Sequence, residues 1–112
     1  MSVYEIIKAA LMARHPLLIV RKGKPRYVCA HVLGTKIDNK AGRSRQNCLF
    51  YQWAGESEKG LGPDGSSLNW RCMHVDEIES AEILKNEPWH TVKGLPTQVS
   101  FCVDVVDAKV WL

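Results

Sequence analysis

The stretch RKGKPRYVCAHVLG, residues Arg21 to Gly34, combines a turn, a basic flank and a strand. Its first part predicts a tight turn, because Gly23 can adopt a positive φ and Pro25 fixes its own φ and donates no backbone hydrogen bond. The segments before the turn (16–20, PLLIV) and after it (26–33) are apolar. We therefore expect them to pair as antiparallel strands across the turn.

The strand after the turn carries two polar residues that point in different directions. Side chains alternate between the faces of a strand, so Arg26 lies with Val28 on one face and His31 with Leu33 on the other. A β-bulge between them would break this alternation. Arg26 and His31 can therefore share one site only if the strand is irregular.

Length and composition are those of an ordinary globular domain. The chain has 112 residues, of which 46% are hydrophobic and 24% charged, and a domain of this size buries roughly 60 to 70% of its unfolded surface. No apolar run approaches the length of a membrane span, and residues 1–14 lack the pattern of a signal peptide. We expect a single domain, no membrane partner and a location in the cytoplasm.

The four cysteines are widely spaced and predict neither a metal site nor a cofactor. Cys29, Cys48, Cys72 and Cys102 form no C-x-x-C pair, which structural zinc sites usually contain. Cys72 and His74 could supply two ligands from one strand face, but no third ligand accompanies them. Buried reduced thiols are the expected state of these cysteines.

Charge is distributed unevenly along the chain. Residues 14–45 contain nine basic residues and one acidic residue, whereas residues 56–82 contain seven acidic residues and two basic ones. Clustered Lys and Arg attract phosphates and release counterions, so the first half favours an anionic partner. The alternative is that solvated turns simply collect charge.

The N-terminal segment 3–14, VYEIIKAALMAR, predicts an amphipathic helix. Its apolar residues recur at helical spacing, Ser2 and Glu5 can form a capping box, and Pro16 ends the helix. We expect it to lie across one face of a sheet. No second helix follows that could complete a helix-turn-helix, so major-groove reading by that motif is not expected.

The rest of the chain predicts short strands separated by polar loops. Residues 38–45 are expected to be a mobile connection, and the glycine-rich residues 54–67 form a long loop of the kind that often carries function. Asp76 and Glu77 predict a turn. The expected strands are 47–53, 68–75, 78–84 and a strand-rich final segment, 99–112.

One helix and five or six strands, with no strand–helix alternation, predict a mainly β protein: a small, strongly bent antiparallel sheet or barrel. Neither a G-x-G-x-x-G nor a Walker-type loop is present, so nucleotide hydrolysis by these loops has no support.

Three groups of residues resemble the WYL domain family, in particular its small stand-alone bacterial form. They are Gly23-x-x-Arg26-x-Val28-x-x-His31-x-Leu33-Gly34, Tyr51-Gln52-x-x-Gly55-x-Ser57 and Trp70-Arg71-x-x-x-Val75-Asp76-x-Ile78. The resemblance runs from the first helix to Trp89. Two departures are Ala30, where such domains commonly have proline, and the lack of the Trp-Tyr-Leu tripeptide near residues 46–48.

The resemblance implies an Sm-like or SH3-like barrel with an N-terminal helix. It implies one domain over 1–112, with the helix at 3–14, the barrel at about 16–90 and a C-terminal strand extension at 97–112. WYL-type domains are regarded as ligand-sensing modules of bacterial transcription regulators and defence systems, with nucleic acids or nucleotides as proposed ligands. Because the usual helix-turn-helix is missing, a sensor or accessory protein with a separate DNA-binding partner is implied.

The chemistry of several side chains suits such a ligand. Arg26 and Arg71 could present planar forks to a phosphate to which His31 and Ser57 donate. Tyr51 and Gln52 could stack on and hydrogen-bond a base. The predicted ligand-binding residues are Arg26, His31, Tyr51, Gln52, Ser57 and Arg71.

Structural roles for the same residues remain open. Arg26 could form an ion pair with Asp76 or Glu77. His31 could be a core histidine, Tyr51 could simply pack with its hydroxyl bonded, and a buried Gln52 must find hydrogen-bond partners.

Three functions follow from the sequence. The leading one is an anion-binding regulatory or accessory domain for nucleic acid or a nucleotide. The second is a protein-interaction module, in which a sheet edge or the segment 99–112 forms a homodimer or pairs with another protein. The third is a phosphodiesterase-like hydrolase that uses His31 or His74. Because the sequence offers no activated nucleophile and no carboxylate pair at metal spacing, we expect no enzyme.

Overall fold

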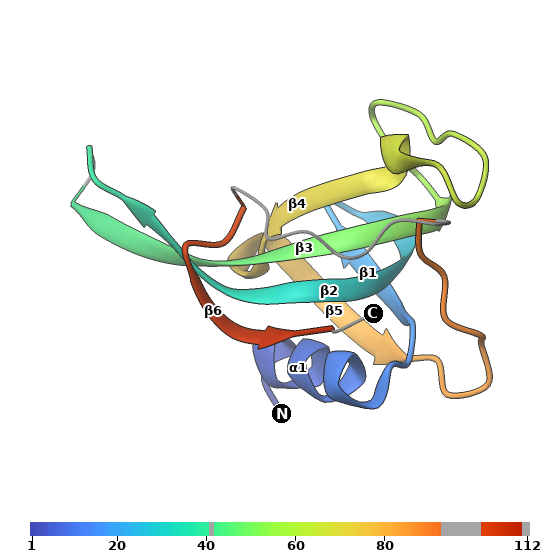
Figure 1. The fold of residues 1–112 in the computed structure, drawn as a ribbon, viewed down its shortest axis with the longest axis horizontal. Coiled ribbons are helices and arrows are strands. Elements are labelled where there is room, and N and C mark those ends of the chain that lie inside the picture. The colour runs from blue at the N-terminus through green and yellow to red at the C-terminus, as the bar shows by residue number, and fades with distance from the viewer. Residues whose placement is uncertain (41, 93–101, 111–112) are drawn as a thin grey trace.

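The computed structural model describes residues 1–40, 42–92 and 102–110 as one helix on a bent antiparallel sheet (Figure 1). The strands follow the order β4-β3-β2-β1-β5, with β6 paired to β2, and the sheet does not close. The predicted mainly β fold with an N-terminal helix is thereby confirmed. The elements are α1 (Val3–Ala13), β1 (Leu17–Arg21), β2 (Lys24–Asp38), β3 (Arg43–Gly55), η1 (Ser67–Asn69), β4 (Trp70–His74), η2 (Val75–Glu77), β5 (Ile78–Ile83) and β6 (Val105–Lys109).

The predicted hairpin between β1 and β2 is confirmed. Arg21 pairs with Lys24, so the turn consists of Lys22 and Gly23 alone, with φ of 52° and 72°. Two positive φ values define the type I′ turn, whose twist matches that of the flanking strands. A local turn signal therefore places β2 in the sheet, where it pairs with β1, β3 and β6.

Helix α1 covers one face of this sheet, as predicted. The Ser2 side chain accepts from the Glu5 backbone N–H while the Glu5 carboxylate accepts from the Ser2 backbone, which completes the capping box. Arg14 ends the helix in a left-handed conformation. The buried helix residues Ile7, Ala10 and Leu11 join the main core with sheet residues such as Phe50.

Two bulges interrupt the β2–β3 ladder. Trp53 of β3 has no opposite residue between the pairs of Tyr27 and Val28, and His31 of β2 is the extra residue between the pairs of Ala30 and Val32. The irregularity that a shared site for Arg26 and His31 requires is therefore present. His31 nevertheless does not line the hollow that contains Arg26, as described below.

Two of the predicted segment boundaries are wrong. Residues 38–45 are not only a connection, because Asp38 pairs with Arg43 and Lys36 with Arg45, which extends β2 and β3 into a protruding hairpin (Figure 1). We call residues 36–40 and 42–45 the β2–β3 arm. The predicted strand 68–75 is also shorter, since residues 67–69 form η1 and the strand spans Trp70–His74.

The expectation of four reduced cysteines is wrong for two of them. Cys72 and Cys102 form a disulfide that joins β4 to the segment before β6, with a sequence separation of 30. Cys29 and Cys48 are free and buried, as predicted. Sequence spacing did not indicate the bond because the two cysteines meet only through the tertiary fold.

The C-terminal segment is described only from Cys102 to Val110. β6 (Val105–Lys109) lies within the predicted strand-rich segment 99–112, residues 102–104 and 110 are described but are not strand, and residues 99–101 and 111–112 of that prediction lie outside the described part. Among the described residues, no helix has the length and apolar character that crossing a membrane requires.

Candidate anion-binding site

A hollow of about 290 Å³ opens between the β1–β2 hairpin, the loop after β3 and strand β4. Its lining includes four cationic side chains, Arg21, Arg26, Lys59 and Arg71, and a single carboxylate, Glu58. We call it the Arg26 hollow. Its charge favours an anion, because a cleft lined by one sign of charge concentrates ligands of the other sign.

Arg26 is the buried cation of this hollow, and it forms no ion pair with a carboxylate among the described residues, although Glu58 lines the same hollow. It is 3% exposed, and its one hydrogen bond among the described residues runs from Nη1 to Gln52 Oε1 at 3.4 Å. The buried Nε has no partner in the same part of the chain. Burial, and then the positive charge of Arg21, lower the pKa of Arg26 below its ordinary value. Such a group gains most from a bound anion, because a buried charge is costly until it is paired.

Gln52 holds Arg26 in place. The fully buried amide donates from Nε2 to the carbonyls of Ala54 and Glu56, at 3.1 and 2.9 Å, so its Oε1 is oriented toward Arg26. The prediction that a buried Gln52 must find partners is confirmed. Its role here is to position the guanidinium rather than to meet a base.

Arg71 organises the loop that forms one wall of the hollow. Its guanidinium donates to Ser57 Oγ and to the carbonyls of Gly60, Leu68 and Trp70, at distances from 2.7 to 3.3 Å. The loop after β3 is thereby fixed to β4. Ser57 lines the same hollow with its hydroxyl already bonded to Arg71, so both residues present a prearranged polar wall.

The alternative ion pair of Arg26 with Asp76 or Glu77 is wrong. Asp76 binds Arg45 at 2.6 Å, and Glu77 binds Arg21 at 2.9 Å. The hydrogen bond from Arg21 is the main reason that the pKa of Glu77 lies below its ordinary value. Both carboxylates thus have other cationic partners.

His31 lies in a separate, aromatic environment. Its ring is fully buried, 4.8 Å from the ring centre of Trp70 and 5.1 Å from that of Trp89. Burial lowers the pKa of His31 to about 4. The ring is therefore neutral near pH 7 and does not line the Arg26 hollow.

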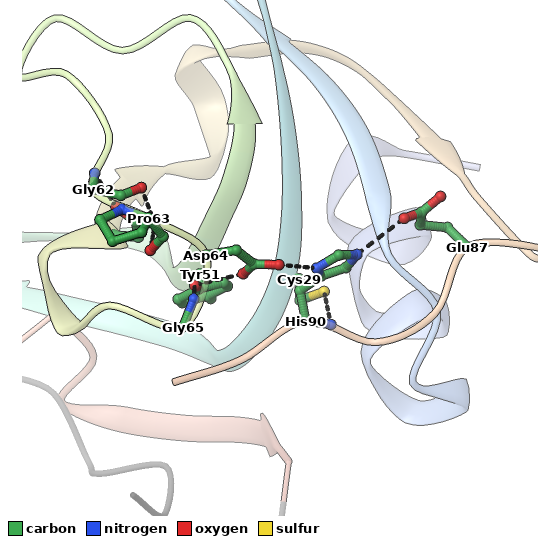
Figure 2. A network of polar contacts seen from close by, with 9 residues as sticks. Cys29, Tyr51, Gly62, Pro63, Asp64, Gly65, Glu87 and His90 are labelled. Atoms are coloured by element: carbon green, nitrogen blue, oxygen red, sulfur yellow. Dashed lines mark hydrogen bonds and ion pairs between the residues drawn. The ribbon is translucent and has the colours of Figure 1, made fainter. Parts of the chain in front are cut away.

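Tyr51 also lies outside the hollow and belongs to a polar network under the loop (Figure 2). Its hydroxyl donates to Asp64 at 2.8 Å and accepts from the Gly65 backbone N–H. Burial is the largest cause of its raised pKa. The alternative that Tyr51 packs with its hydroxyl bonded is thus the arrangement observed.

His90 continues this network toward the segment after β5 (Figure 2). Its Nδ1 lies 2.7 Å from Asp64 and its Nε2 lies 2.9 Å from Glu87, while the Trp53 ring stacks on it at 4.2 Å. Burial pushes the pKa of Asp64 upward, but hydrogen bonds from Tyr51 and His90 outweigh it and lower that pKa. The network thereby connects the loop after β3, through Asp64, to Tyr51 of the sheet and to His90.

The network contains Cys, His and Asp but not the geometry of a nucleophilic triad. The Cys29 Sγ accepts from the backbone N–H of His90, not from its ring, and burial raises the pKa of the thiol to about 12. A thiolate is the reactive form of cysteine, so this thiol is inert near pH 7.

His74, the other predicted hydrolase residue, contacts the Asn47 amide oxygen through its Nδ1. Within the described ranges no group of three or more His, Cys, Asp or Glu residues is arranged to hold a metal ion.

The structure places the six predicted site residues in two regions. Arg26, Ser57 and Arg71 line the hollow and Gln52 supports it from behind, while His31 and Tyr51 lie elsewhere. Arg21 and Lys59 line the hollow but were not predicted. The basic flank of the turn was a signal for Arg21, whereas a lone lysine in an acidic loop gave none for Lys59.

Comparison with known proteins yields no matching family model, no matching curated protein and no matching solved structure. The geometry of the site is therefore the basis for its function.

Proposed function

We propose that the protein binds a phosphate-bearing ligand, a nucleotide or nucleic acid, in the Arg26 hollow and acts as a ligand-sensing regulatory or accessory domain. The observation that carries this proposal is the 3% exposed Arg26, without a counterion among the described residues and surrounded by three further cationic side chains. The role is the one that the resemblance to WYL-type domains implies.

An anion with several oxygens, such as a phosphate, matches the donors of the hollow better than a simple halide does. The guanidinium of Arg26 is planar and can bind two phosphate oxygens in parallel. Lys59 adds a mobile point charge to the same hollow. Trp70 also lines it and is half-buried, so a base attached to the phosphate could stack on an aromatic face there.

Loss of Arg26 should remove the binding. With labelled single-stranded DNA, duplex DNA and RNA as probes, we expect binding that weakens between about 50 and about 200 mM salt. Arg26→Ala should lower the binding affinity by about 10- to 100-fold, because this factor corresponds to the free energy of one or two hydrogen bonds to a charged group. Fluorescence anisotropy measures both effects.

Lys85→Ala is the matched control. Lys85 is exposed and follows β5 at the end opposite to Ile78, so the substitution removes one positive charge away from the hollow. It should change the affinity less than twofold, on the order of a weak surface charge effect. Equal losses in Arg26→Ala and Lys85→Ala, or no binding to any probe, would refute the proposal.

Arg26→Met should stabilise the free protein while it weakens binding as much as Arg26→Ala does. The substitution keeps the length of the side chain and removes a buried charge that has no counterion in the described structure, so the free energy of unfolding should rise by about 1 to 2 kcal/mol. Arg71→Met is the contrast. It removes hydrogen bonds to Ser57 and to three carbonyls, and should lower the same quantity by about 1 to 3 kcal/mol.

Urea denaturation without ligand measures both variants. A loss of stability in Arg26→Met equal to that in Arg71→Met would mean that Arg26 is a structural residue, and the argument for a bound anion would fail.

The interaction-module alternative retains one supporting observation. Val105 and Val106 of β6 are 56% and 42% exposed, and among the described strands β6 pairs with β2 alone. A second copy could pair along this strand, because an unpaired edge is a template for another chain. A concentration-dependent mass in light scattering that Val105→Lys abolishes would support a homodimer, and a constant monomer mass would count against it.

A further inference from the structure

The β2–β3 arm carries a second basic surface. A hollow of about 360 Å³ lies on it, and its lining includes Lys36, Lys40, Arg43, Arg45, His74 and a single carboxylate, Asp38. The arm projects away from the body of the sheet (Figure 1). The exposed side chains of the arm do not contribute to the hydrophobic core, so their charges are accessible to a partner.

Two of these cations have no side-chain partner among the described residues. Lys40 and Arg43 are exposed near the tip of the arm and take part in no ion pair there, whereas Lys36 contacts Asp104 and Arg45 contacts Asp76. The cations near the base are therefore held in place by carboxylates. Asp38, which pairs with Arg43 across the strands, is the one described carboxylate that lines the arm hollow, so the tip keeps a net positive charge whose counterions a polyanion would displace.

The arm surface continues into the Arg26 hollow. Glu77 lies between them, since its Oε1 contacts Arg21 at 2.9 Å and its Oε2 lies 3.8 Å from Arg45. Arg21 lines the Arg26 hollow and Arg45 lines the arm hollow. Asp76 and Glu77 thus lie where the two groups of cations meet, and the two groups form one basic track that is interrupted at this point.

The length of this track exceeds a single nucleotide. From the pair of Lys36 and Arg45 to the pair of Asp38 and Arg43 the arm adds two residues per strand, or about 7 Å along the strands beyond the backbone position of Arg45. Several consecutive phosphates are needed to contact both hollows. A flexible single strand suits the recess around Arg26 better than a duplex, because Arg26 is 3% exposed and a phosphate must enter to reach it.

Building on the function proposed above, we propose that the ligand is a single strand of nucleic acid that places one phosphate in the Arg26 hollow and runs along the β2–β3 arm past Arg45 to Lys40 and Arg43. The arm sets the length requirement of the ligand. The Arg26 hollow binds the individual phosphate.

The test compares a thymidine mononucleotide with an oligothymidylate of about eight nucleotides, a typical site size for a small β domain. The wild type should bind the oligonucleotide more than tenfold more tightly. The double variant Lys40→Ala/Arg43→Ala should bind the mononucleotide like the wild type but lose at least about tenfold on the oligonucleotide. Its salt slope should fall by about 1.4, since each phosphate contact on a single strand contributes about 0.7.

The outcomes separate this inference from the proposed function. Equal affinity of the wild type for both probes, or a double variant that binds the oligonucleotide like the wild type, would overturn the role of the arm and leave the Arg26 site standing. No binding of either probe by the wild type would overturn both. Tighter binding of a duplex of the same length than of the single strand would overturn the choice of a single strand. Lys85→Ala, an exposed lysine outside both hollows, controls for net charge.

Discussion

Serine at both Cys72 and Cys102 is expected to lower the free energy of unfolding by about 3 to 4 kcal/mol. The disulfide joins residues that are 30 apart in sequence, and so restricts the unfolded chain. Loop-closure entropy for a loop of that length gives an effect of this size. The loss is large compared with the total stability of a typical domain, about 5 to 15 kcal/mol.

Urea denaturation of the wild type with and without a reductant provides the measurement. The reductant should shift the wild type to the midpoint of the double serine variant and leave that variant unchanged. A thiol assay on denatured protein should find the two free thiols of Cys29 and Cys48, and all four after reduction. Four reactive thiols without reductant would show that the bond is not formed.

Acid is expected to remove about 3 kcal/mol of stability through His31 alone. Burial lowers its pKa from the ordinary value of 6.5 to about 4, while the unfolded chain titrates near the ordinary value. At a pH between these two pKa values, His31 is protonated in the unfolded state and neutral in the folded state. The contribution is therefore fully present above about pH 6.5 and is lost as the pH falls toward 4.

His31→Gln isolates this contribution. The amide does not titrate, so the free energy of unfolding of the variant should change much less between pH 7 and pH 4 than that of the wild type. The comparison concerns the slope of the free energy of unfolding with pH. This slope remains informative even if the glutamine side chain packs less well than histidine. His15→Gln, at a histidine just after the helix, is the matched control for replacing an imidazole by an amide. Equal slopes in His31→Gln and the wild type would contradict the prediction.

Carboxylates add a second acid-dependent contribution at lower pH. Asp64, Asp76, Glu77, Asp104 and Asp107 all have a lowered pKa in the folded state. Their contributions are lost below the ordinary pKa of a carboxyl group, near pH 4. The loss between pH 6.5 and about 5 therefore reports mainly on His31.

The parts of the fold that were predictable from sequence depend on local chemistry. The turn at Lys22 and Gly23, the capping box of Ser2 and Glu5, and the apolar run of β1 each carry their own signal. The β2–β3 arm carries none, because a two-stranded ribbon with water on both faces shows no apolar alternation. The disulfide was missed because its partners are brought together by the path of β4 and β6.

The site was half predictable for a similar reason. The chemistry of Arg26 and Arg71 marked them as phosphate ligands, and the turn and strand positions bring both to one hollow. Strand alternation predicted that His31 and Arg26 lie apart, whereas the packing of His31 between Trp70 and Trp89 depends on the tertiary fold. Lys59 lines the hollow from a loop whose next residue, Gly60, accepts a hydrogen bond from Arg71, a contact that the sequence does not indicate.

The disulfide also decides what happens to the chain when a protease cuts it. Lys85 is exposed and lies between Cys72 and Cys102 in sequence, so a single tryptic cut after it leaves one cysteine of the bond in each fragment. The two fragments stay covalently joined and migrate together in electrophoresis until a reductant is added. A nicked molecule thus keeps its last strand tethered to its body, and release of that fragment requires a change in redox conditions as well as proteolysis.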